Sequence, residues 1–149
     1  MALPVNFAKN LGVGRGTVVK EFFPGGVIAA KDSVMFRLAS SDEGRILTVI
    51  QATNGAADDV LFAGIALEAA AAASTTVPIK VAVAGYVEGA TTDGSVASGS
   101  PLCLDVSGTA GALGAGTIGA NHIVGIGVEI DTGTVGDVYL FGQGMAGGL

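Results

Sequence analysis

Tryptophan is absent from this 149-residue sequence, and cysteine and histidine occur once each, as Cys103 and His122. A single cysteine cannot form a disulfide within the chain. One cysteine and one histidine also cannot supply the four ligands of a structural zinc site. Disulfide-stapled scaffolds and zinc modules are therefore excluded, and we expect no metal.

Long apolar runs are also missing, although half of the residues are hydrophobic and the mean hydropathy is +0.63. No segment approaches the roughly 18 uninterrupted apolar residues of a membrane-spanning helix. The first ten residues lack the basic segment, apolar stretch and cleavage site of a secretory signal. We therefore expect no membrane partner and a protein that is made in the cytoplasm without export.

Charge is sparse, at 13% of residues, and basic charge is confined to residues 1–80. Residues 81–149 contain six acids and no lysine or arginine, so the net charge of −6 belongs to this half. A nucleic-acid binder needs a basic stripe that displaces counterions from phosphates. We therefore expect no direct nucleic-acid partner.

The 25 glycines punctuate short β-branched runs, which is the pattern of an all-β barrel or sandwich. The short turns between the runs predict a compact antiparallel fold. Residues Glu68–Ala73 favour one helical turn at most, because the alanine run is too short to persist as a helix. The expected strands are Gly16–Phe22, Ser33–Leu38, Ile46–Ala52, Val60–Leu67, Val77–Val87, Pro101–Leu104, His122–Ile130 and Val135–Gly142.

Two segments of the chain resemble each other. Phe62–Glu68 and the run Thr76–Gly85 are echoed by Ile123–Glu129 and the run Thr134–Gly142. Two copies are too few for a solenoid, which needs about three units to be stable. We therefore expect two similar β-hairpins that supply opposite walls of one small barrel.

Residues 1–16 differ from the rest and form the first of two expected units, an extended N-terminal arm; residues 17–149 form a single all-β domain. Two interpretations of the arm remain open: a frayed terminus, or a segment that orders on a neighbouring subunit. Under the second interpretation, apolar and basic side chains of the arm and the first strand make the contact, namely Leu3, Val5, Phe7, Lys9, Leu11, Arg15 and Lys20.

Glycine motifs do not indicate a nucleotide site. Gly114–Gly119 has the letters of a dinucleotide-binding fingerprint but lacks the strand before it and the helix after it that the motif requires. Gly12–Gly16 lacks the lysine and hydroxyl residue that end a phosphate-binding loop. We expect no cofactor.

Catalytic residues are not indicated either. His122 is interpreted as a strand-edge residue and Cys103 as a small core residue, since neither has a neighbouring partner that would activate it. Asp58 and Asp59 are interpreted as a turn cap before a strand. Glu68 and Glu129 occupy equivalent places in the two copies, so each is expected to cap or pin its own hairpin. We expect that the protein is not an enzyme.

Three segments nevertheless resemble the repeated signature of the tailed-bacteriophage capsid decoration (cement) proteins. They are Phe62–Ala71, with its Gly and alanine run, Asp93–Asp105, with its Gly-Ser-Pro hairpin, and Ile123–Glu129. Ser100 stands where the family pattern has Asp, and Gly127 where Ala is common. Members have sometimes been labelled recombinase-like, an activity that the missing phosphate-binding loop argues against.

The resemblance implies a structural virion protein on the outer surface of a phage head, without catalysis. Such a protein binds the major capsid protein as a homotrimer and cements neighbouring capsomers of the expanded capsid. On this interpretation the seven arm and first-strand residues named above, from Leu3 to Lys20, are the expected contacts with the capsid. Two alternatives remain: another all-β virion component, such as a tail-tube or head-fibre base, and a trimeric β-barrel that binds a small ligand or acts as an enzyme.

Overall fold

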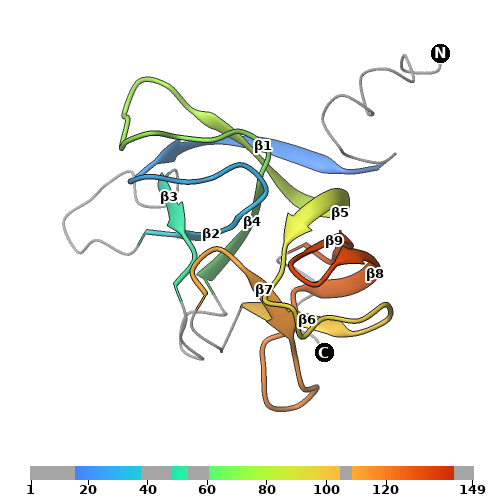
Figure 1. Ribbon diagram of the computed structural model, residues 1–149. Helices are drawn as coiled ribbons and strands as arrows, with labels where there is room; N and C mark the ends of the chain where they lie inside the picture. The colour runs from blue at the N-terminus through green and yellow to red at the C-terminus, as the bar shows by residue number, and fades with distance from the viewer. Residues whose placement is uncertain (1–15, 38–47, 54–60, 105–108, 143–149) are drawn as a thin grey trace.

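Nine β-strands form the regular structure of the described part of the chain (Figure 1). The computed structural model describes residues 16–37, 48–53, 61–104 and 109–142, and these residues contain no α-helix. The prediction of an all-β fold is therefore confirmed. The strands are β1 (Val18–Pro24), β2 (Ser33–Phe36), β3 (Thr48–Gln51), β4 (Phe62–Ala66), β5 (Ile79–Thr91), β6 (Pro101–Leu104), β7 (Leu113–Ala115), β8 (Gly125–Thr132) and β9 (Val135–Leu140).

Five strands close into a barrel, called here the first barrel. They are hydrogen-bonded in the order β1, β3, β2, β4 and the first half of β5, and β5 pairs back onto β1. Every pairing is antiparallel except that of β1 with β3, which is parallel. The predicted antiparallel barrel is thus present with one parallel seam.

The interior of the first barrel is filled by alternating apolar residues of its strands. Phe22 and Phe36 meet edge to face, with ring centroids 5.6 Å apart and an interplanar angle of 73°. Such a pair adds about 1 kcal/mol beyond the burial of its area. The buried residues of this interior are Phe22, Ile28, Val34, Val49, Ala63, Ala66, Ile79 and Val81.

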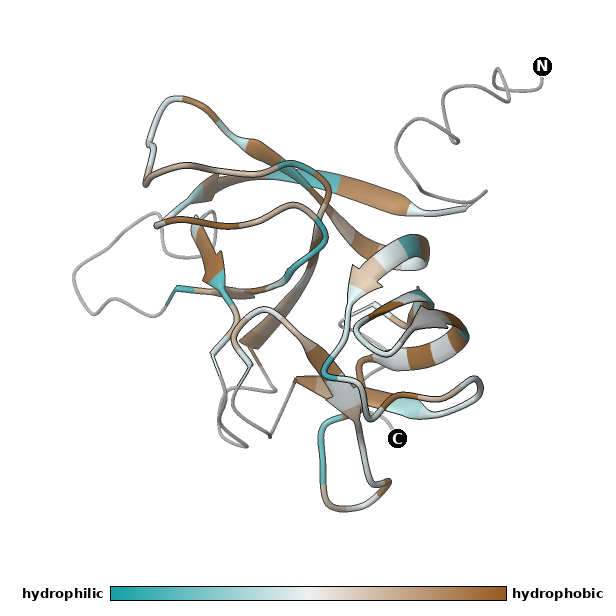
Figure 2. Cartoon of the chain, viewed as in Figure 1, coloured by the Kyte–Doolittle hydropathy of each residue, from teal (hydrophilic) through white to brown (hydrophobic). Residues whose placement is uncertain are grey.

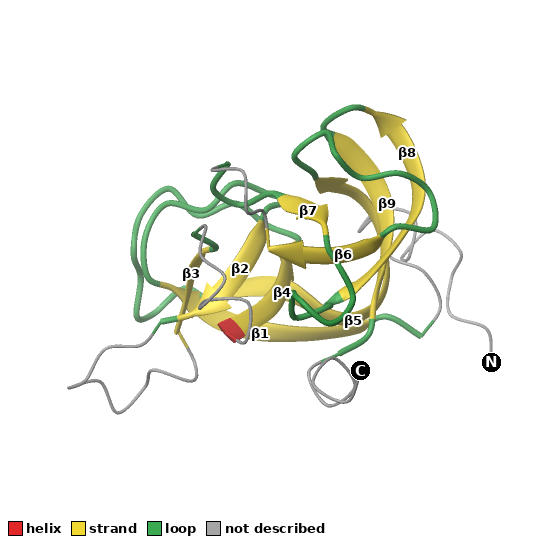
Figure 3. Cartoon of the chain, turned by 90° about the horizontal axis from the view of Figure 1, so that it is seen from below, coloured by secondary structure: helices red, strands yellow, loops and turns green. Residues whose placement is uncertain are grey.

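The second half of β5 leaves the barrel and begins another ring of strands, called here the second ring. β5 continues for 13 residues and pairs with β9, which is followed by β8, β6 and β7. A parallel bridge between Thr92, just after β5, and Leu113 of β7 closes this ring. Figure 3 shows the two units side by side with β5 passing from one to the other.

The second ring repeats the first barrel strand for strand. In each unit the first strand bonds in parallel to the third, the third to the second, the second to the fourth and the fourth to the fifth. The hydrogen bonds match: the N–H of Gly25 donates to Val49 O at 2.7 Å, and the N–H of Asp93 donates to Leu113 O at 2.9 Å. The resemblance between the two halves therefore extends over a whole five-stranded unit.

Loop geometry is repeated as well. The N–H of Lys31 donates to Ala66 O at 2.6 Å, and the N–H of Gly99 donates to Gly127 O at 2.7 Å. Both donors have a left-handed backbone, with φ of 75° for Lys31 and 82° for Gly99. Glycine adopts this conformation freely, whereas a lysine in it costs about 1 kcal/mol. The first unit therefore keeps a strained residue where the second has glycine.

The expected placement of the two hairpins is wrong in one respect. The β4–β5 hairpin belongs to the first barrel and the β8–β9 hairpin to the second ring, so they are not opposite walls of one barrel. The physical reason is the length of β5, whose first half closes one unit while its second half opens the next.

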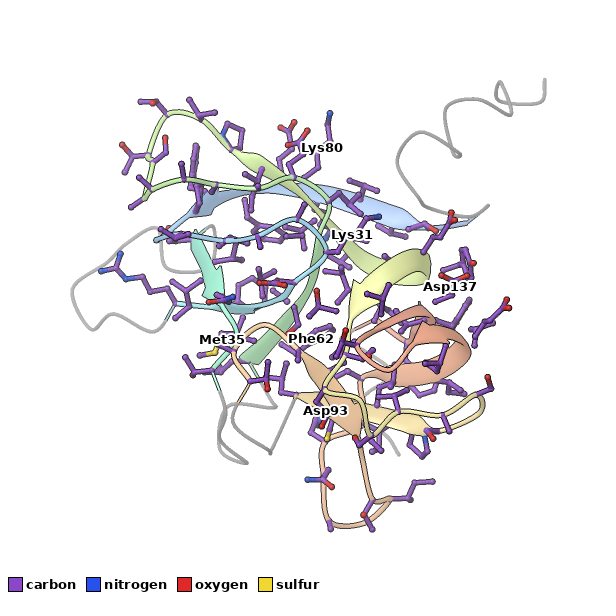
Figure 4. The ribbon with its side chains drawn as sticks, viewed as in Figure 1. Lys31, Met35, Phe62, Lys80, Asp93 and Asp137 are labelled. Atoms are coloured by element: carbon purple, nitrogen blue, oxygen red, sulfur yellow. The ribbon has the colours of Figure 1, made fainter. Side chains whose placement is uncertain are left out.

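One core joins the two units. Outward-facing residues of the first barrel, among them Met35, Phe62, Ile65 and Ala82, belong to the same buried cluster as the interior of the second ring. Met35 and Phe62 lie on the side of the barrel that faces the second ring (Figure 4). The outer wall of the first barrel thus closes the interior of the second ring, which is lined by Val87, Leu102, Leu104, Leu113, Val138 and Leu140.

All eight expected strands are present, with ends shifted by a few residues. The ninth strand, β7, was not predicted. Its three residues, Leu113–Ala115, lie in a glycine- and alanine-rich stretch without β-branched residues. The alanine run expected to form at most a helical turn contains no α-helix; Ala70 pairs instead with Ile28 across an isolated β-bridge.

Candidate functional site

The predicted capsid-contact residues lie almost entirely outside the described part of the chain. Lys20 is described: it is exposed on β1, opposite Val81 of β5. The other six lie outside the described residues: Leu3, Val5, Phe7, Lys9, Leu11 and Arg15.

The start of β1 is held firmly where the two units meet. The hydroxyl of Thr17 donates to the carbonyl oxygen of Tyr86 at 2.8 Å. Gly85 lies directly below, since a Cβ on this residue would come within 2.7 Å of the Thr17 Cα. The chain that precedes β1 therefore starts from a fixed point beside the middle of β5.

A buried carboxylate also lies at the junction of the two units. Asp32 Oδ2 accepts from Gln51 Nε2 at 2.6 Å, and Asp32 Oδ1 accepts from the hydroxyl of Thr91 at 2.9 Å. Gly111 leaves room for this carboxylate, since a Cβ there would approach Asp32 Oδ2 to 2.5 Å. Because its acceptors are used by both units, Asp32 serves to join them.

A second polar cluster lies on the outer side of the second ring. The Tyr86 hydroxyl donates to Asp137 Oδ2, and the N–H of Gly89 donates to Asp137 Oδ1 at 3.0 Å. The hydrogen bond to Asp137 raises the pKa of Tyr86, with further contributions from burial and from the charges of Asp137, Glu88 and Glu129. Tyr86 therefore stays protonated at neutral pH and acts as a donor.

Lys31 approaches the same cluster from the first barrel. Burial lowers the pKa of its ammonium group, and the negative charges of Glu88 and Asp137 oppose this effect. Figure 4 shows Lys31 between the two units, with Asp137 on the second ring. Positive charge from the first barrel thus compensates acids of the second.

The single histidine and cysteine do not lie in a common site. His122 is half-buried in the loop before β8; this strand begins only at Gly125, so the strand-edge interpretation is wrong in position. Cys103 is buried in β6, with its thiol 3.8 Å from Gly114 O, as expected of a core residue. Across the described ranges, no group of three or more His, Cys, Asp or Glu side chains could hold a metal ion.

The fingerprint-like segment Gly114–Gly119 begins in β7 and continues into an exposed loop. In this loop the N–H of Thr117 donates to Asn121 Oδ1 at 2.8 Å, which tightens a turn. A dinucleotide site instead needs a helix whose N-terminus faces the pyrophosphate. The local structure is therefore that of a turn between strands.

Glu68 pins its hairpin as predicted. Its Oε2 accepts from the N–H of Lys80 at 3.0 Å, and its Oε1 lies 3.4 Å from Lys80 Nζ. Glu129, at the equivalent place in the second ring, is exposed and pairs in register with Asp137. Asp58 and Asp59 lie outside the described residues.

The sequence interpretation missed the two polar clusters at Asp32 and at Tyr86. Their partners are far apart in the chain: 59 residues separate Asp32 from Thr91, and 51 separate Tyr86 from Asp137. A strand-by-strand alignment of the two halves could have indicated the second cluster. In that alignment Asp137 takes the position of Lys80, which pairs with Glu68.

No family model matches the chain, and no curated protein matches it. Among the described residues, no helix is long and apolar enough to span a membrane.

Proposed function

We propose that this chain is a structural virion protein that binds the outer surface of a phage head as a trimer and cements neighbouring capsomers. It does so by adhesion and without catalysis. The order of the three signature segments, from Phe62 to Glu129, supports this proposal. The first segment contains β4 and the third contains the start of β8, which are equivalent strands of the two units, and the second segment contains β6.

The observation that carries the proposal is the single core shared by the two units. A clamp across a capsomer seam must keep its two ends at a fixed separation under load. Here the 13-residue strand β5 runs through both units, and the outer wall of the first barrel forms part of the core of the second ring. Movement of one unit against the other would expose buried apolar surface, at about 25 cal/mol for each Å².

The place where the N-terminal segment joins the folded body further supports the proposal. Because Thr17 is tied to Tyr86 at the middle of the body, contacts made by residues 1–16 transmit force to both units. In a trimer three such segments act together, and each bound segment raises the effective concentration of the others. Adhesion then needs no deep pocket.

The test is retention on expanded heads that lack the protein. We predict that deletion of residues 2–14 reduces retention of the protein on heads by at least tenfold, because the apolar and basic side chains of the arm are lost. Co-sedimentation with purified heads measures the bound fraction, and Lys20→Glu serves as a milder variant that weakens retention less. Undiminished retention of the deletion variant would remove the arm from the mechanism.

Electron microscopy of the same particles locates the protein. Density at three-fold and local three-fold positions on the head supports the proposal. Density on the tail indicates the alternative virion role.

A further inference from the structure

The duplication makes one wall of the second ring directly comparable with a wall of the first barrel. In the first barrel a row of register partners crosses β1, β5, β4 and β2 on the outside; in the second ring the corresponding row crosses β5, β9, β8 and β6. The first row is Val19, Ala82, Ile65 and Ser33. The second row, called here the outer row, is Tyr86, Tyr139, Ile126 and Pro101.

The two rows differ in what covers them. Ile65 and Ala82 are fully buried, because the second ring packs on this wall of the first barrel. In the outer row Tyr139 is 49% exposed and Ile126 39% exposed, and Val128, in the nearby bulge of β8, is 47% exposed. Figure 2 shows β8 as alternating brown and pale bands, since these apolar residues alternate with glycine. The wall that is covered in the first barrel is thus uncovered in the second ring.

Negative charge borders the outer row. Glu88 and Glu129 are exposed beside it, and Asp137, two residues before Tyr139 on β9, is buried and accepts from the Tyr86 hydroxyl. Lys80 occupies the position of Asp137 in the first barrel, where it forms an ion pair with Glu68. The second unit therefore presents acids where the first has a balanced pair.

We propose that the outer row is a docking surface for the first barrel of a second copy of this chain. Within one chain, this kind of wall already receives a five-stranded unit of the same fold. Residues 1–80 are neutral overall but contain every lysine and arginine, and of these Lys20 and Arg37 are exposed on the first barrel, where they can meet the acidic border of another copy. A contact between two outer rows would instead bring the exposed Glu88 and Glu129 of the two copies together, which like-charge repulsion disfavours.

The resulting interface is heterologous, because two different surfaces meet. Interfaces of this type form rings when the rotation between neighbours closes. The inference names the interface between chains of the proposed trimer. It rests on the proposed function only for the number of chains in the oligomer. The docking itself requires no capsid.

The test compares the full chain with Tyr139→Glu and Ile126→Glu variants, and with Ile118→Glu as the matched control. Ile118 is 71% exposed in the loop after β7 and is not a member of the outer row, so its replacement adds the same charge at a still more exposed apolar site. Light scattering coupled to size exclusion measures the mass of each protein without heads. Circular dichroism checks that each variant keeps its strands.

We expect a closed oligomer for the wild type and for Ile118→Glu, and a folded monomer, or association weakened at least tenfold, for the two outer-row variants. A monomeric wild type, unchanged association of both variants, or an equal loss in Ile118→Glu contradicts the inference. A variant that loses its strands is replaced by Tyr139→Ser, which removes the aromatic side chain without adding charge. The same outcomes then apply.

Oxidation of a Tyr139→Cys variant distinguishes the two geometries. A face-to-face pair brings the two introduced thiols together and yields disulfide-linked dimers, which contradicts the proposal. A head-to-tail ring keeps them apart and leaves the chains unlinked. Head binding is measured separately. A closed oligomer that does not bind heads contradicts the proposed function but not this interface. A monomer that binds heads contradicts this interface but not the proposed function.

Discussion

At the residue scale, Tyr86 and Asp137 show how a polar pair can tie two strands of a sheet together. The tyrosine hydroxyl and the N–H of Gly89 both donate to the carboxylate, so β5 and β9 are tied at the bulge where their backbone register shifts. Bulges interrupt the ladder and leave backbone groups unpaired. The carboxylate of Asp137 supplies an acceptor for one such backbone group, the N–H of Gly89.

This pair predicts a pH dependence of stability. The folded state raises the pKa of Tyr86, so the unfolded chain releases this proton first as the pH rises through the ordinary tyrosine pKa of about 10. The contribution of Tyr86 is therefore fully present at neutral pH and is lost as the pH rises above about 10. Urea unfolding at several pH values measures it: the decline should be smaller in Tyr86→Phe, and an identical decline in both proteins contradicts this account.

Local residue roles could be predicted from the sequence, whereas long-range roles could not. The pinning by Glu68 and the turn at Asp93, whose Oδ1 accepts from the N–H of Ser95 at 2.7 Å, depend on neighbours in the chain. The buried site of Asp32 depends on Thr91, which only the closure of β5 against the first barrel brings near. A pattern read along the chain does not contain that information.

At the element scale, glycine determines how closely the paired hairpins approach. A Cβ on Gly64 would lie 2.2 Å from Ala82 O, and a Cβ on Gly125 would lie 2.3 Å from Tyr139 O. These contacts are equivalent in the two units. The sequence showed the repeated glycine, but only the structure shows that the reason for it is contact with the backbone of the next strand.

We predict that Gly125→Ala destabilises the protein by about 3 kcal/mol, because the added methyl group must push β8 away from β9. Gly133→Ala is the matched control, since a Cβ there meets nothing within 4 Å, and we expect it to change stability by less than about 0.5 kcal/mol. Thermal or urea unfolding measures both. Equal effects of the two substitutions would show that the close approach of β8 and β9 is not what requires glycine.

The strands themselves were predictable because apolar β-branched runs and glycine-rich turns alternate at short spacing. Their partition into two units was not, because a 13-residue run such as β5 has the same pattern whether it serves one sheet or two. β7 was not predictable for the opposite reason: its residues carry little β propensity and pair because β6 lies beside them.

At the scale of the whole molecule, the two units form one body with a shared core and an uneven charge. All the basic residues lie in residues 1–80, and the second unit carries an exposed apolar row with an acidic border. Such polarity suits a protein that contacts different neighbours with its two ends. It supports the proposed ring of chains and the proposed adhesion to a larger shell.

The most direct measurement of the central claim is the heat and osmotic resistance of expanded heads with and without this protein. Heads are purified without it, then supplemented with the wild type or with the variant lacking residues 2–14, and DNA release is followed as the temperature is raised. The proposal predicts that the wild type raises the temperature of release and that the deletion variant raises it less. Heads that withstand heat and osmotic shock equally well with and without the protein would contradict the claim that it acts as a cement.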